Sequence, residues 1–312
     1  MRIKIQQQQE TKSIKEAFDE FIRYCKVKNL AKDSILFYEN CFKSLTRFIS
    51  LDLRASQISL TTVQDYILWQ KCIPITATAI NANIRGIRAF LYYCMRLGYT
   101  PKFSIELIKA EKKVKVVYSD SELQLLLKKP NIKKCSFAEF RNWVIVNYAL
   151  ATGNRVSTII NLKICDIDFE NGYIMLSKTK NKKQQIIPLA STLEGILNEY
   201  LGYRKGEPSD YLFCNSYGRQ LHDRSLQGDI ARYNKSRGVL KTSIHLFRHT
   251  YAKKFLQAGG NVFQLQRLLG HSSLEIVKEY VNLFSEDLKM NHDKFNPLEQ
   301  MVRYGSYIKM SK

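Results

Sequence analysis

Residues 243–280 have the sequence SIHLFRHTYAKKFLQAGGNVFQLQRLLGHSSLEIVKEY, which indicates three short helices separated by glycine and serine. Ser243 is predicted to be the N-cap of the first helix, which continues through about residue 255. His245 and Arg248 lie three residues apart in it, so they share one face of the helix. The order of these elements decides the fold of the second half of the chain.

The breaks between these helices decide which side chains can meet. Gly-Gly-Asn at 259–261 ends the first helix, residues 263–269 form the second, and Gly270 stops it before His271. The serines that follow cap a third helix and place Tyr280 about two turns inside it. On one continuous helix His271 and Tyr280 would lie on opposite sides, so the break at Gly270 is needed for them to converge.

Upstream, a glycine again ends a helix next to an arginine. The apolar run at 143–151 indicates a helix that Thr-Gly-Asn at 152–154 closes. Arg155 then begins another helix, so its side chain is held at a helix start.

Strand patterns follow this helix. Asn171-Gly172 is the strongest short hairpin signal in the sequence. A basic run at 178–183 forms the tip between the last two strands, and a lysine on such a tip can reach a substrate. The predicted strands are residues 164–169, 173–177 and 185–189.

The residue types in these places suit the transfer of a phosphodiester. Two separated arginines can clamp one phosphate, because each planar guanidinium matches two phosphate oxygens. A tyrosine can form the covalent link, and a lysine or histidine can supply the proton that the departing sugar oxygen needs. Because the cations also stabilise the phenolate and the transition state, this chemistry requires no metal and no cofactor. The candidate catalytic residues are Arg155, Lys180, His245, Arg248, His271 and Tyr280.

Together these motifs resemble those of the tyrosine recombinases, the phage-integrase and Xer-like family. The family pattern Thr-Gly-x-Arg-x-Ser matches residues 152–157, and His-x-x-Arg-His matches residues 245–249. Leu-Gly-His, followed nine residues later by Tyr, matches residues 269–271 and Tyr280. Each of these motifs alone is weak evidence for the family, whereas their combination over roughly residues 116–290 is highly specific for it.

The family pattern also bears on two further positions. The hairpin lysine of the family lies eight residues before a proline, which selects Lys180 before Pro188 and leaves Lys178 as its competitor. Thr158 departs from the pattern, because most relatives carry an acidic residue three places after the first arginine. That carboxylate is thought to support the pocket, so its absence removes no reacting group.

The resemblance implies a site-specific recombinase or integrase that cuts and rejoins DNA without ATP or metal. Tyr280 would attack the scissile phosphate, giving a 3′-phosphotyrosine and a free 5′-hydroxyl. Both arginines would hold the phosphate and His271 would hydrogen-bond it, while Lys180 would protonate the departing oxygen with help from His245. Strand exchange follows when a 5′-hydroxyl of another duplex attacks the linkage.

Two alternative functions use the same residues or the same fold. A DNA topoisomerase would relax supercoils at a single site without exchanging partners. A non-catalytic DNA-binding accessory protein would be expected to have lost the tyrosine or an arginine, and this sequence has lost neither.

The resemblance also implies the architecture. Residues 116–312 would form a catalytic domain that is mainly α with a small β-sheet (α+β). Residues 1–112 would form an all-α, four-helix core-binding (SAM-like) domain, joined by a charged linker at about 109–116. The two would make a C-shaped clamp around double-stranded DNA, with a homotetramer on paired sites and room for accessory proteins. The helices predicted in the first domain are about residues 11–28, 33–49, 60–71 and 76–97.

The charge of the chain agrees with a DNA partner. Its 49 Lys and Arg exceed its 28 Asp and Glu, so the formal charge is +21, which attracts a phosphate backbone over long range. Residues 230–274 contain basic side chains and no acidic ones. On the last helix of the first domain, Phe90 and Tyr92 are predicted to be core residues. The DNA-binding candidates are Lys32, Arg85, Arg88, Lys112, Lys113, Lys178, Lys182 and Lys241.

The remaining composition argues against other classes. The seven cysteines are odd in number and scattered, which predicts reduced thiols in a cytoplasmic protein. The sequence contains no run of about 18 apolar residues and begins without a signal-peptide stretch, so no membrane association is expected. His245 and His249 lie four apart, but no Glu follows the first of them and no third ligand is evident, so a zinc site is not expected.

Overall fold

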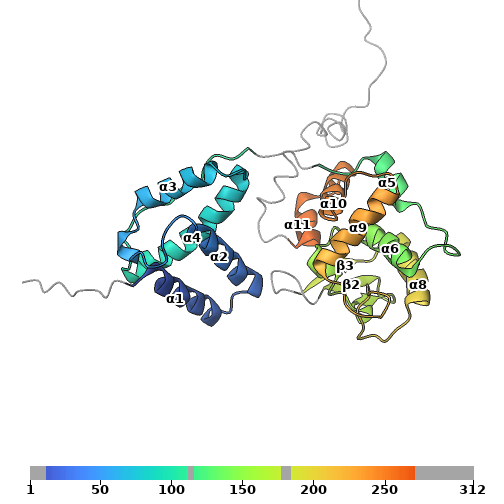
Figure 1. Cartoon of the computed structure of the whole chain (residues 1–312). Helices are drawn as coiled ribbons and strands as arrows, with labels where there is room; N and C mark the ends of the chain where they lie inside the picture. The colour runs from blue at the N-terminus through green and yellow to red at the C-terminus, as the bar shows by residue number, and fades with distance from the viewer. Residues whose placement is uncertain (1–11, 112–115, 177–183, 271–312) are drawn as a thin grey trace, which may run out of the picture. The chain divides into compact units, whose positions relative to one another are not determined.

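The computed structural model describes residues 12–111, 116–176 and 184–270. The chain divides into two compact units, Met1–Lys113 and Val114–Lys312, each with its own hydrophobic core (Figure 1). Several predicted site residues lie outside the described residues, namely Lys112, Lys113, Lys178, Lys180, Lys182, His271 and Tyr280.

Described residues of the first unit form helices close to the predicted spans. Serine and threonine begin three of them, because their side chains accept hydrogen bonds from the first turn, as Ser13 does from the amide of Glu16. The second helix is shorter than expected, since the chain turns after Leu45. The helices are α1 (Ile14–Val27), α2 (Lys32–Leu45), α3 (Leu60–Lys71) and α4 (Ala77–Leu97), with a 3₁₀ turn η1 (Ala55–Gln57).

Aromatic rings fill the core of this unit. Phe18 stacks on Phe42 with ring centroids 3.7 Å apart, and Phe90 meets Phe18 edge-on at 5.3 Å. Phe90 is buried as predicted, but the prediction for Tyr92 is wrong, because its side chain is 41% exposed. The two residues are two positions apart on α4, which turns Tyr92 to the outer face, where its hydroxyl accepts from the amide of Ile105.

The second unit is mainly helical with a small antiparallel sheet in strand order β1-β2-β3 among its described residues. Its first helix begins at Ser119, where Ser-Asp-Ser-Glu at 119–122 matches the sequence pattern of a capping box. The helices are α5 (Asp120–Leu127), α6 (Phe137–Thr152), α7 (Val156–Ile159), α8 (Ser191–Arg204), α9 (Asp223–Ser236), α10 (His245–Gln257) and α11 (Val262–Leu269). The remaining elements are η2 (Ile164–Asp166), β1 (Ile167–Asp168), β2 (Tyr173–Leu176) and β3 (Gln185–Pro188).

The sheet differs from the prediction at its first strand. Residues 164–166 form a 3₁₀ turn, in which the amide of Asp166 donates to the carbonyl of Lys163. The amides of Ile164 and Cys165 donate to the carbonyls of Asp210 and Pro208 instead of a neighbouring strand. The strand itself is only Ile167–Asp168, and residues 169–172 connect it to β2. One face of the sheet is buried through Ile174, Leu176 and Ile187, and the other is exposed through Tyr173, Met175 and Ile186, as a half-buried sheet requires.

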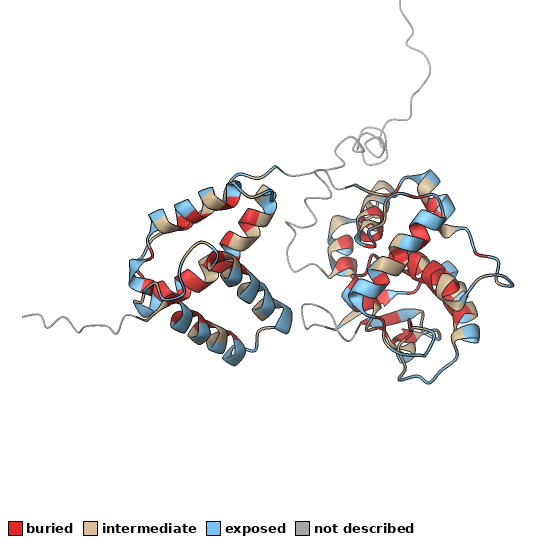
Figure 2. Cartoon of the chain, viewed as in Figure 1, coloured by how far each residue is buried: buried red, intermediate tan, exposed pale blue. Residues whose placement is uncertain are grey.

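Helix α6 lies at the centre of the second unit, packed against α5, α8, α9 and α10. Residues 143–149 are buried apart from Asn147, so this part of the helix is covered on nearly all sides (Figure 2). It ends at Gly153, whose φ of +62° favours glycine. The carboxyl end of this buried helix therefore fixes the place of the residues that follow.

Replacing Gly153 with alanine is expected to destabilise the second unit far more than the same change at Gly172. Both glycines have positive φ, +62° and +69°, which costs an L-residue roughly 1–2 kcal/mol. A Cβ at Gly172 meets open space, whereas one at Gly153 would lie 2.6 Å from Tyr251 and 2.7 Å from Leu269. Urea unfolding should give a loss of roughly 2–5 kcal/mol for Gly153→Ala and roughly 1–2 for Gly172→Ala. Equal losses would contradict this packing.

Candidate active site

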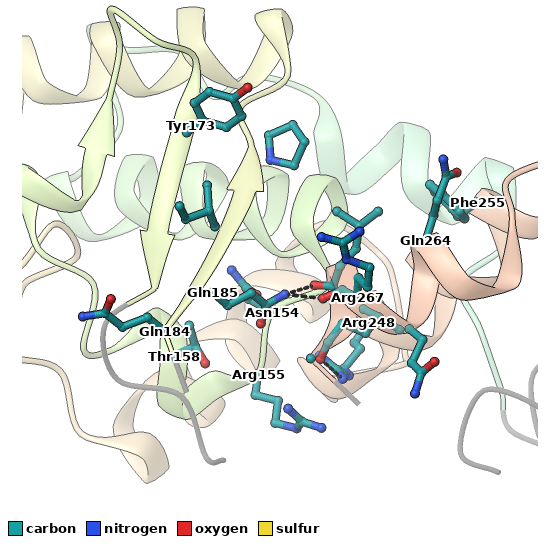
Figure 3. A pocket seen from close by; sticks show the side chains of 16 residues that line it. Asn154, Arg155, Thr158, Tyr173, Gln184, Gln185, Arg248, Phe255, Gln264 and Arg267 are labelled. Carbon is teal, nitrogen blue, oxygen red and sulfur yellow. Dashed lines mark hydrogen bonds between the residues drawn. The ribbon is translucent and has the colours of Figure 1, made fainter. Parts of the chain in front are cut away.

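A cavity of about 1200 Å³ lies in the second unit where three parts of the chain meet (Figure 3). Its lining comes from the junction of α6 and α7, from β2 and β3, and from α10 with the end of α11. The side chains that line it and carry positive charge are Arg155, Arg248 and Arg267, and its described lining contains no Asp or Glu. Such a cavity attracts an anion.

Arg155 occupies the N-cap position of α7, directly after the turn at Gly153 and Asn154. Asn154 is buried, and its side-chain amide donates to the hydroxyl of Tyr148 at 2.7 Å. This bond fixes the backbone from which the half-buried Arg155 side chain projects. In Figure 3 that side chain extends away from the end of α11, whereas Arg248 lies close to it.

Arg248 is buried, with 7% of its surface exposed, and two of its hydrogen bonds go to backbone carbonyls. Its Nη1 donates to the carbonyl of Gly153 at 2.7 Å, and its Nη2 donates to that of Leu269 at 2.8 Å. The guanidinium therefore joins the motif at 152–157 to the motif at 269–271. A planar fork with donors on both arms suits this double bond.

The start of α10 differs from the prediction. Its N-cap is Ile244 without a side-chain bond, and Ser243 instead uses its carbonyl, which accepts from the hydroxyl of Tyr118 at 3.1 Å and from the amide of Leu246. His245 is the first residue of the helix and is exposed. It does not line the cavity, so the structure brings Arg155 and Arg248 together there but places His245 outside the lining.

No pattern in the sequence marks a role for Gln185. It lies on β3, and its side-chain Nε2 donates to the carbonyls of Arg267 at 2.6 Å and Leu268 at 2.8 Å (Figure 3). Both acceptors belong to the last turn of α11. No local pattern marks such a contact, because its partners are distant in the chain.

Thr158, at which the sequence departs from the family pattern, is buried in α7 and lines the cavity. Its amide bonds to the carbonyl of Arg155 within the first turn. Because Thr158 is neutral, it does not offset the positive charge of the arginines that line the cavity.

Two tyrosines that do not line the cavity, buried Tyr148 and half-buried Tyr251, offer no phenolate. Burial raises the pKa of Tyr148 and of Tyr251, so both keep their protons. Tyr173 lines the cavity, and its side chain is exposed. Among the described residues it is therefore the alternative to Tyr280 as the attacking tyrosine.

The DNA-binding candidates in the described ranges differ in their surroundings. Lys32 and Arg85 are exposed, while Arg88 is half-buried and donates to a backbone carbonyl at 3.4 Å. Lys241 forms an ion pair with Glu122 at 2.7 Å and also donates to the carbonyl of Val117. Its ammonium therefore joins the start of α5 to the loop before α10, a structural role that the sequence did not indicate.

Neither a membrane-spanning helix nor a metal cluster is found in the part of the chain that the structure describes. None of its helices is long and apolar enough to cross a bilayer. No three His, Cys, Asp or Glu side chains among the described residues gather to hold a metal ion.

Comparisons with known proteins agree with these motifs. The model of the phage integrase family matches residues 116–287. A tyrosine recombinase of Pseudothermotoga lettingae is 26% identical over 286 residues, covering 89% of this chain and 95% of that protein. The tyrosine recombinase XerD of Oceanobacillus iheyensis is 26% identical over 297 residues, covering 90% and 98%. In fold, the chain is similar to the Tn1549 transposon integrase solved with a circular intermediate DNA, with a TM-score of 0.73 at 19% identity, covering 89% of this chain and 99% of that one.

Proposed function

The chain belongs to the phage integrase family and is a tyrosine-type site-specific recombinase, and we propose that it cleaves and rejoins DNA through a 3′-phosphotyrosine on Tyr280. The observation that carries this proposal is the cavity shared by Arg155 and Arg248. These arginines come from distant motifs, yet they line one space that has no carboxylate in its described lining. A phosphodiester is the substrate that such a space suits.

The proposed reaction is a transesterification in two steps. The Tyr280 hydroxyl gives up its proton with the assistance of His245 as its oxygen attacks phosphorus. The bond from phosphorus to the 5′-oxygen breaks, and that oxygen takes a proton from Lys180; the second step runs these proton transfers in reverse. Arg155 and Arg248 neutralise the charge on the non-bridging oxygens, and His271 donates a further hydrogen bond. A 5′-hydroxyl from a second duplex then attacks the phosphotyrosine and releases the tyrosine. Each phosphodiester lost is replaced, so the reaction needs no external energy.

We assign the first unit to DNA binding as a core-binding domain and the second to catalysis. The exposed cations Lys32 and Arg85 would contact the DNA backbone, as would Arg88 and the basic residues of the chain at 112–113, 178 and 182. We omit Lys241, because its ammonium is engaged by Glu122. The two units would enclose the duplex as a C-shaped clamp, and paired sites would assemble a homotetramer in the cytoplasm, with room for accessory proteins.

Strand exchange between two marked duplexes is the expected result that tests this function. Two duplexes of different length that carry the same site, one of them labelled, are incubated with the protein in EDTA without ATP. Hybrid products of predictable length should appear. Relaxation of a supercoiled plasmid without any hybrid product would favour the topoisomerase alternative, and DNA binding without cleavage would favour the accessory protein.

A further inference from the structure

The last turn of α11 is held by side chains from two other elements. Gln185 on β3 donates to the carbonyls of Arg267 and Leu268, and Arg248 on α10 donates to the carbonyl of Leu269. The carbonyls at the end of a helix have no partners within the helix. Here three consecutive ones accept from side chains outside the helix, and that of Arg267 also accepts from the amide of Gly270, so the end of α11 is joined to the sheet and to α10 at once.

Because Gly270 has no side chain, Gln185 can lie close to the end of α11. It ends α11 with a φ of +61°. A Cβ at this position would lie 2.6 Å from the Oε1 of Gln185. The glutamine amide therefore lies directly against the helix end, with its nitrogen on the carbonyls and its oxygen against Gly270.

We propose that Gln185 is a positioning residue that fixes the hairpin strand β3 to the end of α11. It thereby keeps these two walls of the cavity in a fixed position relative to each other. This role rests on the proposed function. In the sequence, Gln185 follows Lys180 by five positions, and Gly270 directly precedes His271. One side chain thus joins the two chain segments on which those proposed catalytic residues lie. Partners that orient catalytic groups commonly contribute 10–100-fold to activity.

The chemistry of the site discriminates among replacements of Gln185. An amide nitrogen supplies two donors to the carbonyls. Glutamate has a similar shape but only acceptors, and its charge is unfavourable at a helix carboxyl end. Leucine keeps the volume without a donor. Lysine supplies donors and a charge that a helix carboxyl end favours, so Gln185→Lys is the variant expected to restore function.

Two measurements on the full-length chain test the proposal. The first is amide hydrogen exchange of the peptide that covers α11, which needs no activity. The second is single-turnover formation of the covalent adduct on a nicked duplex, with the Kd for the same DNA measured in parallel. Gln227→Leu is the matched control, because Gln227 is an exposed glutamine whose side chain donates to Asp223 on the same helix, α9.

Gln185→Leu and Gln185→Glu should speed exchange at the end of α11 by about tenfold and slow adduct formation by roughly 10–100-fold. The Kd should stay within about twofold, and Gln185→Lys should return the rate to within about fivefold of the parent. Unchanged exchange in Leu and Glu variants would overturn the proposal, and so would faster exchange with an unchanged rate of adduct formation. If the parent protein forms no adduct, the proposed function fails, while the exchange experiment still decides whether Gln185 holds α11.

Discussion

Tyr280→Phe is expected to abolish the covalent protein–DNA adduct and strand exchange while DNA binding stays within about twofold. Phenylalanine keeps the ring and removes only the oxygen that would attack phosphorus. Loss of a covalent nucleophile lowers the rate by at least about 10⁴-fold. Because the arginines and the surrounding cations would bind the phosphate, the affinity for DNA should not depend on that oxygen.

A nicked, end-labelled duplex taken from the DNA that flanks the gene serves as the substrate, since the nick allows the cleaved strand to diffuse away and traps the adduct. A denaturing gel then separates adduct from free DNA. Tyr173→Phe tests the competing tyrosine, which lines the cavity. Should the adduct persist in Tyr280→Phe and vanish in Tyr173→Phe, the assignment of the nucleophile is wrong.

Arg248→Ala is expected to cost both activity and stability, whereas Arg155→Ala should cost mainly activity. Each change removes a guanidinium from the proposed phosphate site and should slow adduct formation by about 10³-fold. Arg248 is buried and bonds to the carbonyls of Gly153 and Leu269, so its loss leaves buried acceptors without a donor. That costs about 2–5 kcal/mol of unfolding free energy. Arg155 is half-buried at a helix start, and its loss should cost about 1 kcal/mol or less.

Urea unfolding and single-turnover cleavage, measured on the same preparations, separate the two effects. Arg248→Lys is the informative companion, because it keeps the charge but lacks the planar fork that reaches both carbonyls. It should recover little of either quantity. Equal stability of the Arg248→Ala and Arg155→Ala variants would show that the bonds of Arg248 to the two motifs do not hold the site together.

Much of the local structure could be predicted from the sequence, because it depends on neighbours within about four positions. Ser119 with Glu122 starts α5, Gly153 ends α6, and Gly270 ends α11, as their patterns indicate. The presence of Arg155 and Arg248 in one cavity also follows the motifs of the family. The pattern misplaced the N-cap of α10, which is Ile244 and not Ser243, whose carbonyl accepts from the hydroxyl of Tyr118.

The sequence by itself indicated the family, the order of the elements and the candidate side chains for binding a phosphate, since these depend on residue types at short spacing. Only the tertiary structure decided which partners those side chains have. Arg248 bonds to the carbonyls of both flanking motifs, Gln185 holds the end of α11, and Lys241 pairs with Glu122. Every residue carries the same backbone carbonyl, so the sequence does not show which carbonyl a side chain will bond to. The fold decides this, because it brings the two groups within reach of each other.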